Sequence, residues 1–365
     1  MTTQSVVAVG LLLFGLGGCE SLSSYDPKNF DQPDPASALQ RIQPPFVSRG
    51  GSLATLKDNR LLLVGGIVPS TAPGATNPTN DVEIYDPATD AWTVVAPMAQ
   101  FRSVPAAATT ADGRVVVVGD NTASVNIIRN GAEVYNPGSN SWTVLPPPAL
   151  ATYEFPAALG LRGPGNRVLL TGSLGLVLLD VATGIANVVP GASFNGTRGA
   201  ALALLKDGRA LCTFGNRYYI FSPVTNGLVQ TGQLRYTRYY AGATTADNGR
   251  VYIGGGQVSA TNVTAAPVRG IEVYDPDSAR LVRTPPGLAS ETGYASVGMY
   301  QYAQRILFLS NSAGDGLLDL EKNRAVTGGN GYPGGSYSRA NGQLTDGRIV
   351  VLPNIIADLS KYSRP

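Results

Sequence analysis

Arginine, glutamate and tyrosine side chains that can bind or transform a ligand recur at one sequence register. Reading back a short, similar distance from each of a series of Arg-containing turns leads to Arg49, Arg102, Arg198 and Arg238. At the third and sixth turns the same reading leads to Glu154 and Glu291. Tyr239 and Tyr294 lie within a few residues of these positions. Converging guanidiniums bind a carboxylate or sulfate bidentately, and tyrosine rings offer stacking faces for a sugar. The arginines and tyrosines are therefore candidate ligand-binding residues. The two glutamates are candidate catalytic residues. Burial raises the pKa of a carboxyl group toward neutral pH, where the group can take up and release a proton during catalysis.

The composition limits which other chemistry is open to the chain. Histidine is absent from all 365 residues, which removes the usual general base and the commonest metal ligand. We expect no copper or catalytic zinc site and no cofactor. A net charge of +2 argues against a nucleic-acid partner. The 44 glycines, the 26 prolines and the low share of charged residues, 14%, favour many short strands joined by turns.

A motif of a turn, an arginine and a hydrophobic run recurs from residue 58 to the C-terminus. Its seven copies are DNRLLLVGG, DGRVVVVGD, GNRVLLTGS, DGRALCTFG, NGRVYIGGG, AQRILFLSN and DGRIVVLPN. Continuous apolar runs such as residues 115–118 are typical of strands buried on both faces. Seven copies of one motif predict seven repeats of one structural unit.

Two further elements follow the motif in several units, and together they carry a resemblance to a known family. VEIYDP at 82–87, AEVYNP at 132–137 and IEVYDP at 271–276 form the second element, with weaker copies at 178–184 and 219–223. AWTVVAPM at 91–98 and SWTVLPPP at 141–148 form the third. The double glycines at 65–66 and 254–255, the Tyr-Asp-Pro turn and the tryptophan resemble kelch repeats. The resemblance implies an all-β, seven-bladed β-propeller of four-stranded blades.

The two ends of the chain are predicted to close this ring. The seventh motif leaves too few residues for a complete last blade, so another segment must supply the missing strand. ALQRIQPPF at 38–46 is similar to the tryptophan-containing element, and IIADLS at 355–360 is similar to the Tyr-Asp-Pro element. We therefore expect residues near 40–45 to pair with the last blade and to remove an open edge. The propeller would span residues 39–365.

The N-terminal segment predicts export and lipid anchoring. Residues 6–16 form an apolar run that is too short to span a bilayer but suits a signal peptide. Leu16-Gly17-Gly18-Cys19 resembles the bacterial lipobox, in which the cysteine thiol carries a diacylglycerol. Residues 1–18 are therefore expected to be a signal peptide and residues 19–38 a tether after lipidated Cys19. With Cys19 used in this way, Cys212 has no internal disulfide partner. By analogy with lipoprotein sorting, the expected place is the cell envelope, on the periplasmic or surface side of the outer membrane, with the anchor as the only membrane contact.

The kelch resemblance implies that the registered arginines lie at one mouth of a central channel, where two interpretations remain open. They bind an anionic ligand, or they hold the channel together by pairing with carboxylates or carbonyls of neighbouring blades. The leading functional hypothesis is a non-enzymatic binding protein for a glycan or protein ligand. Loops at 67–80 and 257–268 would border its binding face. The alternative is a carbohydrate-active enzyme, a sugar-acid mutarotase or epimerase, a lyase or a hydrolase. Copper oxidation of the galactose oxidase type is excluded because it needs histidine ligands.

Overall fold

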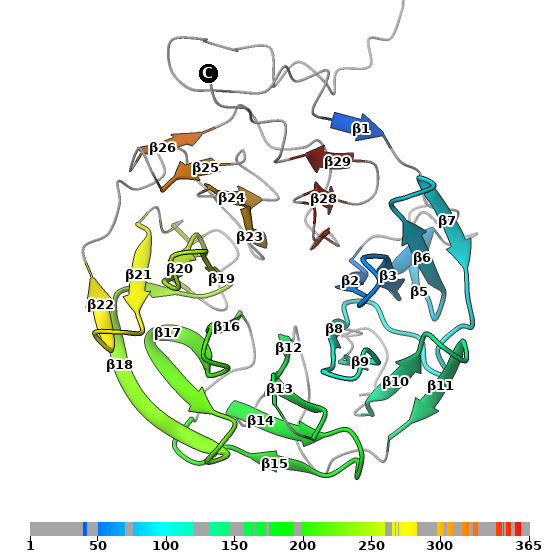
Figure 1. Cartoon of the computed structure of the whole chain (residues 1–365), viewed down its shortest axis with the longest axis horizontal. Coiled ribbons are helices and arrows are strands. Elements are labelled where there is room, and N and C mark those ends of the chain that lie inside the picture. Colours follow the sequence, from blue (N-terminus) through cyan, green and yellow to red (C-terminus); the bar gives the residue numbers. More distant parts are fainter. Residues whose placement is uncertain are drawn as a thin grey trace, which may run out of the picture.

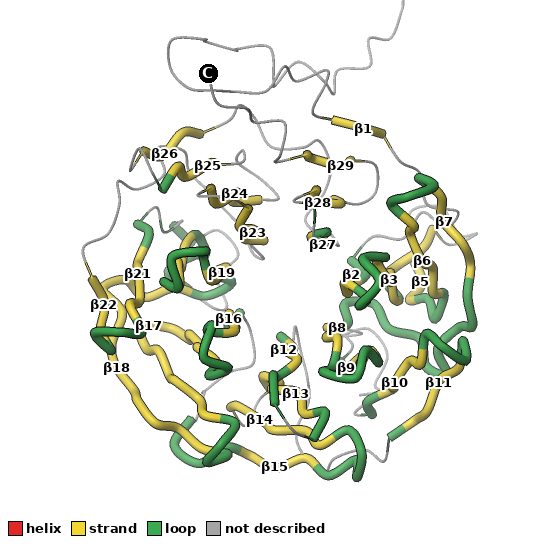
Figure 2. Tube along the Cα trace, in the orientation of Figure 1, coloured by secondary structure: helices red, strands yellow, loops and turns green. Residues whose placement is uncertain are grey.

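The regular structure is entirely β among the residues that the computed structural model describes. These are residues 39–41, 50–69, 76–119, 131–145, 157–163, 165–172, 175–192, 199–259, 265–266, 268, 270–282, 298–302, 305–309, 316–320, 324–327, 341–344, 346, 348–351 and 355–358. Figure 2 shows strands and connecting loops in this part of the chain, and none of its elements is a helix. Accordingly, no described helix is long and apolar enough to cross a membrane. The all-β prediction is confirmed.

The strands form antiparallel sheets that follow the order of the sequence motifs. The first sheet holds β2 (Ser52–Thr55), β3 (Leu61–Val64), β6 (Val82–Asp86) and β7 (Ala91–Val94). The second holds β8 (Ala106–Thr109), β9 (Val115–Val118), β10 (Glu133–Asn136) and β11 (Ser141–Val144). The third holds β12 (Ala158–Gly160), β13 (Arg167–Gly172), β14 (Gly175–Asp180) and β15 (Ala186–Val188). The fourth holds β16 (Ala201–Leu204), β17 (Ala210–Ser222) and β18 (Gly227–Arg238).

Three more sheets complete the series. The fifth holds β19 (Gly242–Thr245), β20 (Val251–Gly254), β21 (Glu272–Asp275) and β22 (Arg280–Val282). The sixth holds β23 (Gly298–Tyr302), β24 (Arg305–Leu309), β25 (Gly316–Asp319) and β26 (Arg324–Thr327). The seventh holds β27 (Asn341–Gln343), β28 (Arg348–Val351), β29 (Ile355–Asp358) and β1 (Leu39–Arg41). The sheets succeed one another around a common centre (Figure 1), as the blades of a kelch propeller do.

The first and last described segments of the chain meet in the seventh sheet. β1 runs antiparallel to β29, with Leu39 opposite Ala357 and Arg41 opposite Ile355. On the inner strands, the Thr55 hydroxyl donates to the carbonyl oxygen of Gln343 at 2.7 Å. The first sheet is therefore bonded directly to the seventh.

The hydrophobic core lies between neighbouring sheets. One cluster joins the first and second sheets, and includes Val64, Ile84, Val115 and Val117. Similar clusters lie between each of the next four pairs of sheets, and a smaller one packs Leu344 of the seventh sheet against the first. The four valines of β9 are at most 1% exposed, as expected for a strand covered on both faces. Burial between sheets is the main stabilising term of this architecture.

Each sheet has two edges that differ in chemistry. At what we call the turn edge, the inner strand turns back through a motif such as residues 110–114, and the third strand turns into the fourth. At the latter turn Asp90, Asn140 and Ala279 have positive φ, between 48° and 54°. In the three-stranded fourth sheet the equivalent turn joins β17 to β18, and Asn226 there has a φ of 55°. At the opposite edge, the loop edge, the second strand ends, the third begins, and the chain crosses to the next sheet.

The loop edge carries a hairpin that the sequence did not predict. We expected a loop over residues 67–80, but β4 (Ile67–Pro69) pairs antiparallel with β5 (Thr76–Pro78). The pairing satisfies backbone groups that an irregular loop would leave to water. Gly65 precedes this hairpin with a φ of 61°, and a Cβ there would lie 2.7 Å from the carbonyl oxygen of Arg102. Glycine is therefore required at position 65, both because φ is positive and because no room is left for a side chain.

Candidate functional site

Arg102 joins the first two sheets at the loop edge. Its amide donates to the carbonyl oxygen of Thr79 at 3.0 Å, and its own carbonyl accepts from Gly66 at 2.8 Å. Both partners flank the β4–β5 hairpin, which forms a two-stranded sheet of its own between β3 and β6 in sequence. The side chain enters the second sheet instead. Arg102 lies just before β8, the inner strand of the second sheet.

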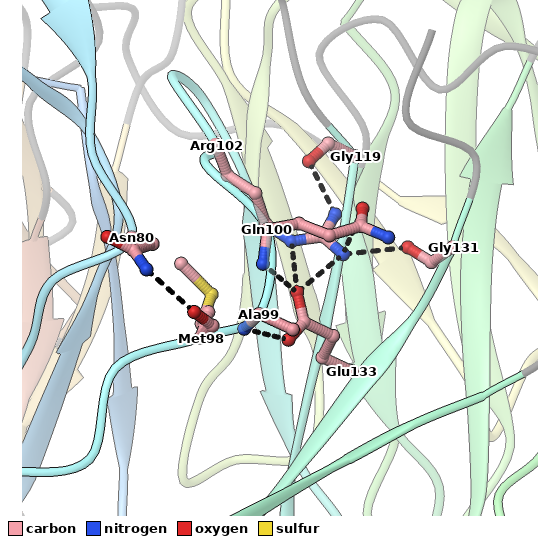
Figure 3. Close-up of polar contacts among 8 residues, drawn as sticks. All are labelled: Asn80, Met98, Ala99, Gln100, Arg102, Gly119, Gly131 and Glu133. Carbon is pink, nitrogen blue, oxygen red and sulfur yellow. Dashed lines mark hydrogen bonds and ion pairs between the residues drawn. The ribbon is translucent and has the colours of Figure 1, made fainter.

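The Arg102 guanidinium is completely buried and bonded by several acceptors (Figure 3). Nη1 donates to the carbonyl oxygen of Gly119 at 2.9 Å, where the second strand ends. Nη2 donates to the carbonyl oxygen of Gly131 at 2.9 Å, just before the third strand. Nη2 and Nε also lie 3.2 and 3.3 Å from Oε1 of Glu133. One side chain thus fixes the ends of two strands and a buried carboxylate.

Both oxygens of the Glu133 carboxylate accept hydrogen bonds. Its side chain is 0% exposed, and its oxygens accept backbone amides from Ala99 at 2.6 Å and Gln100 at 3.2 Å. These amides belong to the segment that crosses from the first sheet to the second. A buried carboxylate bonded by a guanidinium and two amide donors is held rigidly. We refer to Arg102 and Glu133 with these backbone partners as the first Arg–Glu pair.

The crossing from the fourth sheet to the fifth repeats this geometry with Arg238, the last residue of β18, and Glu272 of β21. Arg238 Nη1 donates to the carbonyl oxygen of Gly255 at 3.0 Å, and Nη2 donates to that of Gly270 and to Glu272 Oε2, both at 2.8 Å. The amide of Arg235 donates to Glu272 Oε1, as that of Ala99 does to Glu133. Burial lowers the pKa of Arg238, and Glu272 opposes that shift. This is the second Arg–Glu pair.

Tyr239 lies next to the second pair and is half-buried. Its ring packs edge-on against Phe214, with ring centroids 5.3 Å apart. Its backbone exchanges two hydrogen bonds with Gln257, at 2.8 and 2.9 Å. The following Tyr240 has a φ of 60°, and its amide donates to the carbonyl oxygen of Gly199, two residues before β16. The crossing between the fourth and fifth sheets is therefore as firmly fixed as that between the first and second.

The structure brings some of the sequence candidates into these pairs and leaves others untested. Arg102, Arg238 and Tyr239 lie at the loop edge as placed above. The remaining candidates lie outside the described residues, namely Arg49, Arg198, Tyr294, Glu154, Glu291 and Cys19. Ligand binding by the registered arginines therefore stays a prediction. Within the described ranges, no cluster of three or more acidic or cysteine side chains is suited to a metal ion.

The sequence predicted the kind of partner of the two buried arginines but not which residues they are. The expected partners were carboxylates or carbonyls of the neighbouring blade, and Arg238 at the end of β18 in the fourth sheet does pair with Glu272 on β21 of the fifth. Arg102 differs, because it precedes β8 and pairs with Glu133 on β10 of the same sheet. Both glutamates belong to the Tyr-Asp-Pro element, two residues before its tyrosine. One signal was available, because Arg102 and Arg238 both precede their glycine partner by 17 residues. A constant separation of that kind points to a repeated contact.

Residues 48–99 match the family model of the Kelch motif. The match covers the first sheet, its β4–β5 hairpin and the start of the crossing to the second sheet. It supports a kelch-repeat protein. Kelch repeats generally mediate binding to proteins or other ligands, so the match is compatible with a binding role.

Proposed function

We propose that this protein is a binding protein whose loop edge recognises a glycan or protein ligand. The observation that carries the proposal is the repeated Arg–Glu pair, which immobilises the crossings between sheets. Rigid loops lose little conformational entropy when they bind, which favours recognition. The described arginines that the sequence offered as ligand residues hold this surface in shape, so the ligand contacts are expected from exposed side chains around them.

The proposal includes a closed, seven-bladed propeller. Support comes from the β1–β29 pairing and from the Thr55–Gln343 hydrogen bond, which link the two ends of the chain. On the turn edge, Arg348 of the seventh sheet also donates to the carbonyl oxygen of Pro87 in the first sheet, at 3.4 Å. A closed ring has no unpaired terminal blade and presents one continuous loop edge.

A ligand screen with a matched structural control tests the binding role. The purified protein is titrated with a panel of neutral oligosaccharides, acidic oligosaccharides and sugar acids, and binding is read as an increase in melting temperature. A ligand of the loop edge should lose affinity when β4–β5 is replaced by a two-residue turn. It should keep its affinity when Asp112→Asn alters the opposite edge. A ligand that is lost only with Asp112→Asn would contradict the placement.

We further propose that the protein is anchored in the cell envelope through a lipid on Cys19. The support is the sequence alone, in which Cys19 ends a signal-like apolar run. Wild-type protein should incorporate labelled fatty acid and sediment with membranes, and Cys19→Ser should do neither. Unlabelled wild-type protein would show that it is secreted without an anchor. The enzymatic alternative rests on Glu154 and Glu291, and turnover of a sugar acid that survives in both Glu→Gln variants would remove them from it.

A further inference from the structure

Tyr240 has a backbone conformation that its side chain does not favour. Its φ is 60°, in the left-handed region where residues other than glycine, asparagine and aspartate are strained. Five of the other six described non-glycine residues with positive φ are Asn or Asp, and the sixth is Ala279. Tyr240 is therefore the one residue with a large side chain that the described part of the chain holds in this conformation.

Close backbone contacts on both sides impose the conformation. On the side of the fourth sheet, the Tyr240 amide donates to the carbonyl oxygen of Gly199 at 2.8 Å, and a Cβ at Gly199 would lie 2.9 Å from Cδ1 of the tyrosine ring. On the side of the fifth sheet, a Cβ at Gly256 would lie 2.5 Å from the carbonyl oxygen of Tyr239. Only glycine fits at either contact. The backbone of residues 239 and 240 is thus held between the two sheets.

The rings of Tyr239 and Tyr240 lie over neighbouring glycines of the fourth sheet. The register of β16 and β17, continued by two residues, places Gly199 beside Gly215. The Tyr240 ring rests on Gly199, and the Tyr239 hydroxyl oxygen would lie 3.4 Å from a Cβ at Gly215. Adjacent strands are about 4.8 Å apart, so the two rings form one aromatic surface. It lies where the inner strands β16 and β19 begin, near the common centre of the sheets (Figure 1).

The fold does not require aromatic residues at these two positions. The crossing between the first and second sheets is also fixed by an Arg–Glu pair, but Ser103 and Val104 follow its arginine where Tyr239 and Tyr240 follow Arg238. Tyr239 and Tyr240 are both half-buried, so part of each side chain remains exposed. Backbone strain is concentrated at binding and catalytic sites. A strained tyrosine that the crossing itself does not need points to contact with a ligand.

The chemistry of this surface favours a neutral sugar. Arg238, which the sequence offered as an anion-binding residue beside Tyr239, is buried against Glu272. The backbone amide and carbonyl of Tyr239 are bonded to Gln257, so they cannot pair with an added peptide strand. Partly exposed rings with phenol hydroxyls remain. They suit the apolar face of a sugar ring and its hydroxyl groups.

We propose that Tyr239 and Tyr240 form a stacking platform for a neutral, β-linked oligosaccharide. Sugars linked in this way present flat faces of C–H groups, and consecutive units stack on the two rings. Phe214, which packs edge-on against Tyr239, supports the platform. The platform deepens the proposed binding function by naming the class of ligand, and it rests on that function.

Isothermal titration calorimetry with matched hexasaccharides tests the platform. Cellohexaose is neutral and β-linked, maltohexaose is neutral and α-linked, and hexagalacturonate is acidic. Cellohexaose should bind most tightly, and added salt should not weaken its binding, because no charge takes part. Tyr239→Ala and Tyr240→Ala should each weaken the binding of cellohexaose about fivefold. Tyr240→Phe should keep the affinity, because the ring remains.

Tyr240→Asn separates recognition from loss of structure. Asparagine tolerates the left-handed φ, so the melting temperature should be kept or raised while the affinity for cellohexaose falls as in Tyr240→Ala. A residue that only packs would behave in the opposite way, with a lower melting temperature and unchanged affinity. Phe101→Ala is the matched control. It removes a ring that is 47% exposed at the crossing between the first and second sheets, and it should leave the affinity unchanged.

Four outcomes would overturn the platform: no binding of cellohexaose, equal or tighter binding of maltohexaose, hexagalacturonate or a decaproline peptide, full affinity in both alanine variants, or an equal loss with Phe101→Ala. Each of them leaves the wider proposal intact if another ligand from the screen binds the loop edge.

Discussion

The first Arg–Glu pair yields the most quantitative prediction for stability. Arg102→Ala would leave the Glu133 carboxylate buried without its cation, and would leave the carbonyl oxygens of Gly119 and Gly131 without their guanidinium donor. Breaking a buried ion pair from one side costs about 3–5 kcal/mol. We expect the free energy of unfolding to fall by about 4 kcal/mol. The amides of Ala99 and Gln100, which Glu133 accepts, should also exchange with deuterium faster.

Urea denaturation at neutral pH measures this cost against a matched surface pair. Arg114 and Asp112 form an ion pair at 2.7 Å, but their side chains are 31% and 36% exposed. Arg114→Ala should therefore cost less than about 1 kcal/mol. The double variant Arg102→Met/Glu133→Leu should cost much less than the two single changes added together, because no charge remains buried. Equal costs for Arg102→Ala and Arg114→Ala, or strict additivity in the double variant, would refute the reasoning.

Three other substitutions or conditions have expected outcomes. Ala279 has a φ of 53° where the corresponding turns carry Asp or Asn, so Ala279→Asn should stabilise the protein by about 1 kcal/mol in urea denaturation; a loss of stability would contradict the assigned turn. Gly160→Ala would place a Cβ 1.9 Å from the carbonyl oxygen of Thr109 in the neighbouring sheet, and should cost about 3 kcal/mol by the same assay; a neutral result would mean that the two inner strands are further apart. The hydrogen bond from Arg60 lowers the pKa of Asp58, so the stability this contact adds is present above the carboxyl group's ordinary pKa and disappears as pH falls through its lowered value; Asp58→Asn should therefore flatten the acid limb of the stability curve, and an unchanged limb would refute the assignment.

The sheet architecture was predictable because its signals are local. Val115–Val118 is continuous, apolar and β-branched, and it is a strand covered on both faces. The weaker Tyr-Asp-Pro element at 219–223 is also extended, but it continues β17 from Ala210 instead of starting a new strand, so the fourth sheet has three strands and not the expected four. Tyr219 to Ser222 form the part of β17 that pairs with β18. Side-chain periodicity and turn residues specify such elements without reference to distant parts of the chain.

The contacts at the loop edge were not predictable in the same way. Arg102 and Glu133 are 31 positions apart, and nothing in the composition around either residue announces a buried ion pair. Their burial depends on where the crossing between sheets passes, which is a tertiary property. The β4–β5 hairpin was missed for a related reason. Pro69 and Pro78 are typical of loops, and strands of three residues carry too little periodicity to be recognised.

The pairing of β1 with β29 has a consequence for the order in which the protein is made. Thr55 and Gln343, which bond across the same boundary, are 288 positions apart. At about 5–20 residues per second, the first segment waits about 15–60 s for its partner to leave the ribosome. Throughout that interval Leu53, Leu61 and Leu63 lack the contact with Leu344 that completes their cluster. The newly made first sheet therefore offers an apolar face to chaperones, or to other nascent chains, until Leu344 and the strands of the seventh sheet have been made.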